Sequence, residues 1–267
     1  MKIDNLLVRV EENNRIYEMP LRAAAKLPVK DLNGFFIYNF LMFTYPNDKP
    51  DYLKTGFRKL CIDSWHIAFP RMRIIYVDVS KCLGLSPFTD FYFERKSYPT
   101  DPLRILFLSR LNRAIYCDTD VYLRSDARDH LPLECKCFVG AWGCSGTFLY
   151  NKKRNNKKFI KWFKVYNKIP LDAKEYKCTD AIVYCRNKKA LKIPEVNTTN
   201  ICNHFSNIWI YIRDEIPFFL SDKENREINN RVSFSKECYT AFIYYLKNKG
   251  WYDKYVKEDA KDYIRFV

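Results

Sequence analysis

Apolar positions along the first half of the chain change from strand-like to helix-like spacing and back again. Residues 34–46 form an apolar, aromatic run that ends in a proline-containing loop, which predicts a buried strand. Residues 52–68 have apolar positions closer to helical spacing, and Pro70 ends that pattern. Residues 72–79 predict a second strand. A strand, a helix and a strand in this order form a βαβ unit, so we expect a parallel sheet.

The middle of the chain continues the alternation of helices and strands. Residues 101–111 predict a helix in which Asp101 is the N-cap and a proline occupies the first helical position. A short strand is expected at 114–117, and 138–150 predicts two strands joined by a glycine-containing turn. Apolar and lysine positions in 151–167 predict a basic amphipathic helix.

The ends of the chain complete the expected organisation. Two short apolar stretches, 6–10 and 16–19, predict a hairpin, and another helix is expected to begin in 180–185. The fold class is therefore α/β, with a mixed, Rossmann-like sheet flanked by helices. We expect an N-terminal extension, a catalytic domain and a helical, aromatic and basic C-terminal segment packed on that domain. These correspond to residues 1–33, 34–210 and 211–267.

Composition narrows the class of partner. Apolar residues make up 48% of the chain and aromatic residues 17%, which indicates a packed protein rather than a disordered one. The net charge of +15 attracts phosphate in some form: nucleic acid, anionic lipid or a nucleotide. The alternative to an anionic partner is a lysine-rich surface that binds none, because net charge indicates solubility and weak binding rather than a specific function.

Cysteine usage and hydropathy indicate the compartment. The 10 cysteines are scattered and include no Cys-x-x-Cys pair, so we expect free thiols and no structural zinc site. The first residues lack the pattern of a secretory leader. The longest apolar run is interrupted at Asn39 and is shorter than the roughly 20 residues of a spanning helix. A cytoplasmic protein is expected, either soluble or peripheral at the inner face of a membrane.

Asp118 and Asp120 are the residues most suggestive of chemistry. They follow a predicted buried strand and are separated by one residue. Alternate residues of an extended strand point the same way, so both carboxylates could bind one cation. Mg²⁺ and Mn²⁺ prefer oxygen ligands, often completed by substrate phosphates. Ligands in open α/β sheets bind at the carboxyl ends of strands, where this pair falls.

This region resembles the donor-binding region of retaining GT-A glycosyltransferases. Residues 98–123, YPTDPLRILFLSRLNRAIYCDTDVYL, are similar to glycosyltransferase family 32, whose pattern is Asp-x-x-Arg, a short helix and a strand ending in Asp-x-Asp. Residues 143–153, GCSGTFLYNKK, resemble a turn of family 8, and 203–209, NHFSNIW, resemble a late His…Trp element of both families. The resemblance covers roughly residues 35–210 and implies a metal-dependent transferase that uses a nucleotide sugar, with UDP as the expected nucleotide.

The resemblance implies a role for each matched residue. Asp120 would bind Mn²⁺ or Mg²⁺, Asp118 would bind metal and ribose, and His204 would contact metal or phosphate. Arg104 would reach the donor phosphate or sugar, and Asp101 would accept hydrogen bonds from sugar hydroxyls. The alternative for Asp101 and Arg104 is an i,i+3 salt bridge at the surface. A structural histidine is the alternative for His204.

Four further residues are predicted to take part in binding or catalysis. Gly146 lies in the turn that resembles family 8 and would approach the donor. Asp180 would orient an acceptor hydroxyl, although an N-terminal helix cap would use the same residue type. Tyr45 and Tyr52 flank the loop after the first strand and would stack on a nucleobase, but aromatic core residues would look the same.

The implied reaction is transfer to a glycan or lipid-linked acceptor with retention at the anomeric carbon, in lipopolysaccharide or other polysaccharide biosynthesis. An effector that glycosylates a host protein is a rival within this class. A nucleic-acid-binding protein, a metal-dependent nuclease or nucleotidyltransferase, and a catalytically silent binding module are rivals from other classes, with nucleic acid the less favoured partner.

The basic, aromatic residues of 236–267 could dock on an anionic membrane or simply complete the core.

Overall fold

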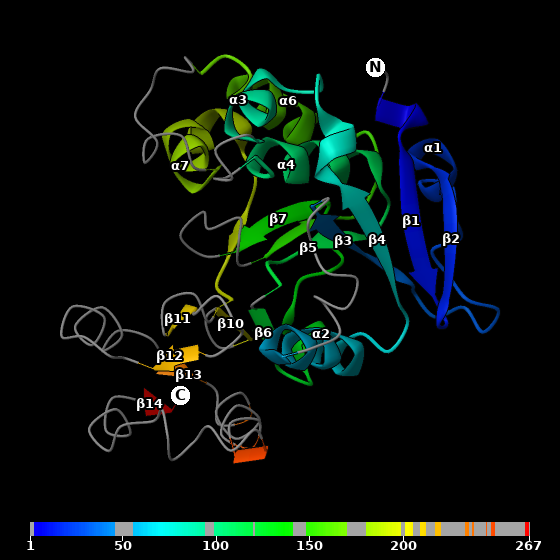
Figure 1. Cartoon of the computed structure of the whole chain (residues 1–267), viewed down its shortest axis with the longest axis vertical. Coiled ribbons are helices and arrows are strands. Elements are labelled where there is room, and N and C mark those ends of the chain that lie inside the picture. The colour runs from blue at the N-terminus through cyan, green and yellow to red at the C-terminus, as the bar shows by residue number, and fades with distance from the viewer. Residues whose placement is uncertain are drawn as a thin grey trace. The chain divides into compact units, whose positions relative to one another are not determined.

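Figure 1 shows the protein as a computed structural model of the whole chain. Contacts between residues divide the chain into two compact units, each assembled from separate segments. The first unit comprises Met1–Asp48, Arg71–Cys117 and Pro132–Val196, and the second comprises Lys49–Pro70, Asp118–Leu131 and Asn197–Val267. The expected ranges 1–33, 34–210 and 211–267 divide the chain by sequence pattern and stay a prediction. The structure describes residues 3–45, 56–93, 99–119, 121–140, 148–169, 180–198, 201–204, 209–211, 217–219, 233–234, 237, 244, 247–248 and 265–266.

An eight-stranded mixed sheet forms the centre of the first unit. Its strand order is β2-β1-β4-β3-β5-β8-β7-β9. The strands are β1 (Leu7–Glu12), β2 (Arg15–Pro20), β3 (Tyr38–Thr44), β4 (Met72–Asp78), β5 (Ala114–Tyr116), β7 (Cys137–Gly140), β8 (Leu149–Asn151) and β9 (Glu195–Val196). The expected α/β class with a mixed sheet and flanking helices is confirmed.

The middle of the sheet is parallel, as the βαβ pattern predicts. β3 pairs in parallel with β4 along its whole length and with β5 on its other side. β5 is buried throughout, and β3 and β4 are buried over most of their residues. Such continuous burial explains why these strands read as apolar runs rather than as an alternation of apolar and polar residues.

Antiparallel strands extend the sheet on both sides. The predicted N-terminal hairpin is confirmed as β1 and β2, and β1 pairs with β4 through Val10 and Ile75. Figure 1 shows this hairpin beside β4 at one edge of the sheet. On the other side β8 runs antiparallel to β5 and β7, which confirms the two strands expected in 138–150.

The helices of the first unit include one that is buried along nearly its whole length. They are η1 (Ile3–Asn5), α1 (Leu21–Ala24), η2 (Val79–Cys82), α3 (Pro87–Phe93), α4 (Asp101–Arg110), α6 (Lys157–Tyr166) and α7 (Asp180–Leu191). Figure 1 shows α3, α4, α6 and α7 grouped together. All residues of α4 from Asp101 to Ser109 are buried, so this helix is enclosed on every side.

The starts of two helices differ from the sequence prediction. The N-cap of α4 is Thr100, whose carbonyl accepts from the Arg104 amide, and Asp101 is the first helical residue. Asp101 does not cap because its carboxylate is paired with a side chain of its own helix. The basic helix begins at residue 157 instead of 151, because Asn155 has a φ of 61° and the Asn156 side chain accepts from the Lys158 amide.

The second unit contains shorter elements. They are α2 (Gly56–Ala68), β6 (Val121–Leu123), α5 (Ala127–His130), β10 (Cys202–His204), β11 (Trp209–Tyr211), β12 (Pro217–Phe219), β13 (Ser233–Phe234) and β14 (Arg265–Phe266). The helix expected in 52–68 is present as α2. The two pairs β11–β12 and β13–β14 were not predicted from the pattern, and the helical character expected for the rest of 211–267 stays a prediction.

The state of the cysteines and the presence of a membrane-spanning helix can be examined in the described residues. The seven described cysteines form no disulfide with one another. Within the same part of the chain, no helix combines the length and the apolar character needed to cross a bilayer.

A buried asparagine connects the end of α4 to the sheet. The Asn151 side-chain amide donates to the carbonyls of Leu108, Leu111 and Lys153 at 2.7, 3.0 and 3.0 Å. Its oxygen accepts from the Asn156 amide at 2.8 Å. Asn151 is fully buried, so its hydrogen bonds form away from water, where an unmade bond is costly. One side chain therefore joins β8, the carboxyl end of α4 and the start of α6.

Replacing this amide by a carboxylate tests its importance. We expect Asn151→Asp to lower the free energy of unfolding by about 3 kcal/mol, because a buried anion would face carbonyl oxygens that have lost their donor. Urea unfolding measures the change. Asn14→Asp is the matched control, since Asn14 is exposed at a φ of 61° that aspartate tolerates, and it should change stability by less than about 0.5 kcal/mol. Equal losses in the two variants would contradict the argument.

Candidate functional site

The strand order reverses at the centre of the sheet. The chain passes from β3 to β4 on one side and then to β5 on the other side of β3. In open α/β sheets such a reversal leaves a crevice outside the carboxyl ends of the strands, where ligands bind. The carboxyl ends of β3 and β5 are Thr44 and Tyr116. The ends of these two strands are therefore the candidate ligand site of the first unit.

Aromatic rings and one guanidinium lie at these strand ends. Phe43 of β3 and Tyr116 of β5 have ring centroids 6.0 Å apart. The Arg104 guanidinium carbon lies 4.7 Å from the centroid of the Tyr116 ring, within the range of a cation–π interaction. Arg104 belongs to α4, so the helix brings a fixed positive charge to the carboxyl end of β5.

Asp101 and Arg104 form a buried ion pair. Arg104 Nη2 lies 2.5 Å from Asp101 Oδ1, and the Tyr166 hydroxyl of α6 donates to Asp101 Oδ2 at 3.3 Å. Asp101 is 2% exposed and Arg104 is 7% exposed. The i,i+3 salt bridge considered from the sequence is present, but its surface location is wrong because α4 is enclosed on every side.

Burial changes what this pair contributes. An exposed i,i+3 pair is worth a few tenths of a kcal/mol, whereas removing one partner of a buried pair costs roughly 3–5 kcal/mol because a charge is left without compensation. Each Asp101 oxygen has a donor, one from Arg104 and one from Tyr166. The arrangement holds the Arg104 side chain in one orientation beside Tyr116. The hydrogen bonds predicted from sugar hydroxyls to Asp101 stay a prediction.

The Asp118 segment starts the second unit directly after β5. Cys117 is the last residue of this segment of the first unit and Asp118 the first of the second. The Asp118 carbonyl accepts from the Val121 amide at 3.0 Å, which closes a turn around the two residues between them. Asp120 lies outside the described residues, so the prediction that its side chain points the same way as that of Asp118 stays a prediction.

β6, which follows this turn, is held to α2 by two side chains. The Trp65 indole donates to the Val121 carbonyl at 2.7 Å. The Leu123 amide donates to the Ser64 hydroxyl at 2.9 Å. Trp65 and Ser64 are both buried. These bonds fix the backbone that begins one residue after Asp120.

β10 brings His204 beside the same turn. The antiparallel register places His204 opposite Val121 and Cys202 opposite Leu123. Opposite residues in such a pair have Cα atoms about 4.5–5.5 Å apart. The backbone of His204 therefore lies next to the residue that follows Asp120, as a shared ligand set requires. The side chain of His204 is outside the described part of the structure.

The Glu237 carboxylate, from the C-terminal segment, binds Tyr122 of β6 and Ser125 just after this strand. Glu237 accepts from the Ser125 amide at 3.0 and 3.2 Å and from the Ser125 hydroxyl at 2.9 Å. The Tyr122 hydroxyl donates to the same carboxylate at 3.3 Å. α2, β10 and Glu237 thus all hold β6, the strand attached to the predicted metal-binding turn.

The side chains near β6 that could bind a metal ion offer oxygen and nitrogen atoms more readily than sulfur. Burial raises the pKa of the Cys202 thiol well above its usual range, which favours the neutral thiol over the thiolate. Among the described residues, no group of three or more His, Cys, Asp or Glu side chains is placed to hold a metal ion. The set Asp118, Asp120 and His204 includes two side chains beyond that description and stays a prediction.

The remaining predicted residues are only partly described. Tyr45 is half-buried and packs against the hydrophobic core, as its alternative role requires. Asp180 is the first residue of α7, and its side chain is not described. Tyr52 and Gly146 lie outside the described residues. Their predicted contacts with the donor or acceptor stay predictions.

Several residues that shape the site were not identified from the sequence. Tyr166 is 65 positions from Asp101, and no local spacing links them. Glu237 is 112 positions from Ser125. Trp65 falls in the range 52–68 that was predicted as a helix, but its indole N–H has a specific partner in β6. The one available clue was that a buried tryptophan usually donates a hydrogen bond.

Comparison with known proteins provides no further assignment. No protein-family model matches the chain, and no curated protein matches it. The resemblance to glycosyltransferase families therefore depends on the quoted motifs alone.

Proposed function

We propose that this chain is a metal-dependent glycosyltransferase of the GT-A type that uses a nucleotide-sugar donor. One observation carries the proposal: the Asp118-Thr119-Asp120 segment follows directly on β5, one of the two strands at which the sheet order reverses. The pairing of His204 opposite Val121 adds a third potential ligand beside the same turn. A donor with a diphosphate matches such a site, because Asp and His can hold a cation that binds phosphate oxygens.

The family resemblance implies that Arg104 contacts the donor, and its surroundings in the first unit hold this charge in place. Arg104 is oriented by Asp101, which Tyr166 also holds, and it lies over the Tyr116 ring. A guanidinium held in this way needs no reorganisation when charge develops on a leaving group. Arg104 would bind the donor phosphate or sugar, and Asp101 would act at least as the group that positions it.

The second unit would hold the cation. Asp118, Asp120 and His204 would be its ligands, and the bonds from Trp65 and Ser64 to β6 limit movement of the turn. When bound, Mn²⁺ or Mg²⁺ would supply Lewis acidity to the diphosphate. Asp118 could also accept a hydrogen bond from the ribose.

The overall reaction transfers a glycosyl group from the nucleotide sugar to a hydroxyl of the acceptor. The bond between the anomeric carbon and the diphosphate oxygen breaks, a bond to the acceptor oxygen forms, and the acceptor proton is released. UDP as the nucleotide, retention at the anomeric carbon and a glycan or lipid-linked acceptor follow from the family resemblance. Asp180 is the proposed group for orienting the acceptor hydroxyl.

Metal dependence is the first test. We expect UDP to bind the wild-type chain only with Mn²⁺ or Mg²⁺, as measured by isothermal titration calorimetry. Asp120→Ala should abolish this metal-dependent binding and turnover against a panel of nucleotide sugars, while circular dichroism shows an unchanged fold. Asp129→Ala is the control, because Asp129 is an exposed carboxylate of the same unit. Turnover that persists in excess chelator would rule out a metal-dependent reaction.

Arg104 provides the second test. Arg104→Lys should lower kcat by at least about tenfold, because an ammonium lacks the planar fork and the stacking of a guanidinium. The thermal unfolding midpoint should be measured on the same preparation, since the pair with Asp101 is buried. Arg22→Lys, an exposed change in the same unit, should retain wild-type kinetics. A folded Arg104→Lys variant with unchanged kcat and KM would show that Arg104 does not contact the donor.

A further inference from the structure

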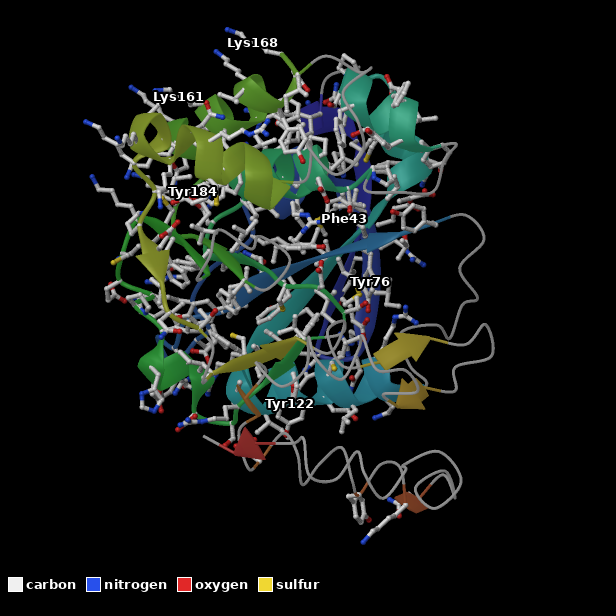
Figure 2. The ribbon with its side chains drawn as sticks, turned by 90° about the vertical axis from the view of Figure 1, so that its left-hand side faces the viewer. Phe43, Tyr76, Tyr122, Lys161, Lys168 and Tyr184 are labelled. Carbon is white, nitrogen blue, oxygen red and sulfur yellow. The ribbon has the colours of Figure 1, made fainter. Side chains whose placement is uncertain are left out.

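The outer face of α6 and the turn that follows it carry a row of lysines. Lys157, Lys161, Lys164 and Lys168 are all exposed and follow one another at spacings of four, three and four residues. These spacings place them along one side of a helix. Figure 2 shows Lys161 and Lys168 pointing outward from the molecule. The opposite side of α6 is buried through Phe159, Trp162 and Tyr166.

α7 continues this basic surface. Its exposed cations are Arg186, Lys188 and Lys189, followed by Lys192 just after the helix. The two helices are joined directly, because the Lys161 ammonium donates to the Ala190 carbonyl at 2.8 Å and the Lys158 ammonium to the Lys192 carbonyl. We call the exposed cations of both helices the lysine face. Its members are Lys157, Lys161, Lys164, Lys168, Arg186, Lys188, Lys189 and Lys192.

Within the described part of the chain, few acidic side chains accompany the lysine face. α6 contains no acidic residue. Among the described acidic side chains, Glu195 is the one recorded near the lysine face, 4.0 Å from Lys188. An ordinary solvated helix surface alternates charges of both signs, which forms favourable i,i+4 pairs. The lysine face instead places like charges at these spacings.

This arrangement lowers the stability of α6 itself. Like charges at i,i+3 and i,i+4 each cost a few tenths of a kcal/mol. Lys157 and Lys158 also stand in the first turn, where the helix dipole disfavours cations. Helix stability therefore gives no reason for the row. An anionic partner would relieve both penalties.

We infer that the lysine face is an electrostatic docking surface for a membrane that carries anionic phospholipid. All four exposed cations in the α6 row are lysines, which act as compact point charges and suit a diffuse surface potential better than a bidentate phosphate site. The large exposed hydrophobic residues of the described chain include none in α6 or α7. The described residues of this face therefore offer no exposed aromatic ring for stacking on single-stranded nucleic acid. Binding depends on charge without insertion of apolar side chains.

The inference goes beyond the proposed transferase activity and does not depend on it. It also concerns a surface different from the basic, aromatic residues 236–267. A binding experiment on the full chain tests it without any sugar donor. Failure of the membrane experiment would leave the proposed reaction untouched, and a chain without transferase activity could still dock through the lysine face.

Sedimentation with lipid vesicles is the test. The full chain is mixed with phosphatidylcholine vesicles, with or without phosphatidylserine, at low salt and at about 1 M salt, where the Debye length is about 3 Å. We expect binding only to vesicles that contain phosphatidylserine, and loss of that binding at high salt. The triple variant Lys157→Glu, Lys164→Glu, Lys168→Glu should lower the vesicle partition coefficient by about 100-fold or more, as three lysines each contribute a several-fold factor.

A matched triple variant distinguishes the effect of charge on the lysine face from the effect of the net charge of the whole chain. Arg15→Glu, Arg22→Glu and Lys26→Glu change the net charge by the same amount at exposed positions of the β2–α1 region in the same unit. This control should keep binding within about threefold of wild type. Replacing the three α6 lysines by arginine should preserve binding. Circular dichroism and thermal unfolding establish that each variant is folded.

Three outcomes would overturn the inference. They are no binding of the wild-type chain to phosphatidylserine vesicles at low salt, equal losses in the two triple variants, and unchanged binding in the folded α6 variant. Duplex DNA is tested in parallel by a filter-binding assay. Loss of DNA binding in the α6 variant while vesicle binding is retained would assign the lysine face to nucleic acid instead of membrane.

Discussion

The buried ion pair between Asp101 and Arg104 is the interaction on which the arrangement of the first unit depends. Two charges remain inside a protein only when each is compensated. Tyr166 supplies a further donor to Asp101, and the Tyr116 ring lies beside Arg104. Because these groups come from α4, α6 and β5, compensating one pair determines how two helices sit on the sheet. Asn151 supports the same helix at its other end.

In the second unit, several contacts hold the short strand β6 in place. β6 has three residues, too few to be stable through one neighbour. α2 binds its backbone through Trp65 and Ser64, β10 pairs with it, and Glu237 binds the turn that follows. The turn that begins at Asp118 is thereby attached to a rigid element. A metal site benefits from such support, because ligand geometry is set by the groups that hold the ligands.

α6 combines the two kinds of surface that the chain presents. Its inner side contributes Trp162 to the core and Tyr166 to the buried ion pair, and its outer side carries the lysines. Substitutions on the inner side therefore act on the core and on the orientation of Arg104. Substitutions on the outer side change charge without altering packing. The proposed membrane docking and the proposed catalysis can thus be examined separately on one helix.

The sequence by itself determined the βαβ unit, the N-terminal hairpin and the strands at 114 and 138–150, because periodicity and turn residues act within a few neighbours. It also predicted Asp118, Asp120 and His204 as one ligand set, of which the structure shows only that the backbones of His204 and Val121 are paired. The tertiary structure alone decided that Asp101 is buried with Arg104 instead of capping α4, that Tyr166 donates to Asp101, and that Glu237 accepts from Ser125. Those contacts join residues far apart in the chain, and their energies depend on burial, which local spacing does not encode.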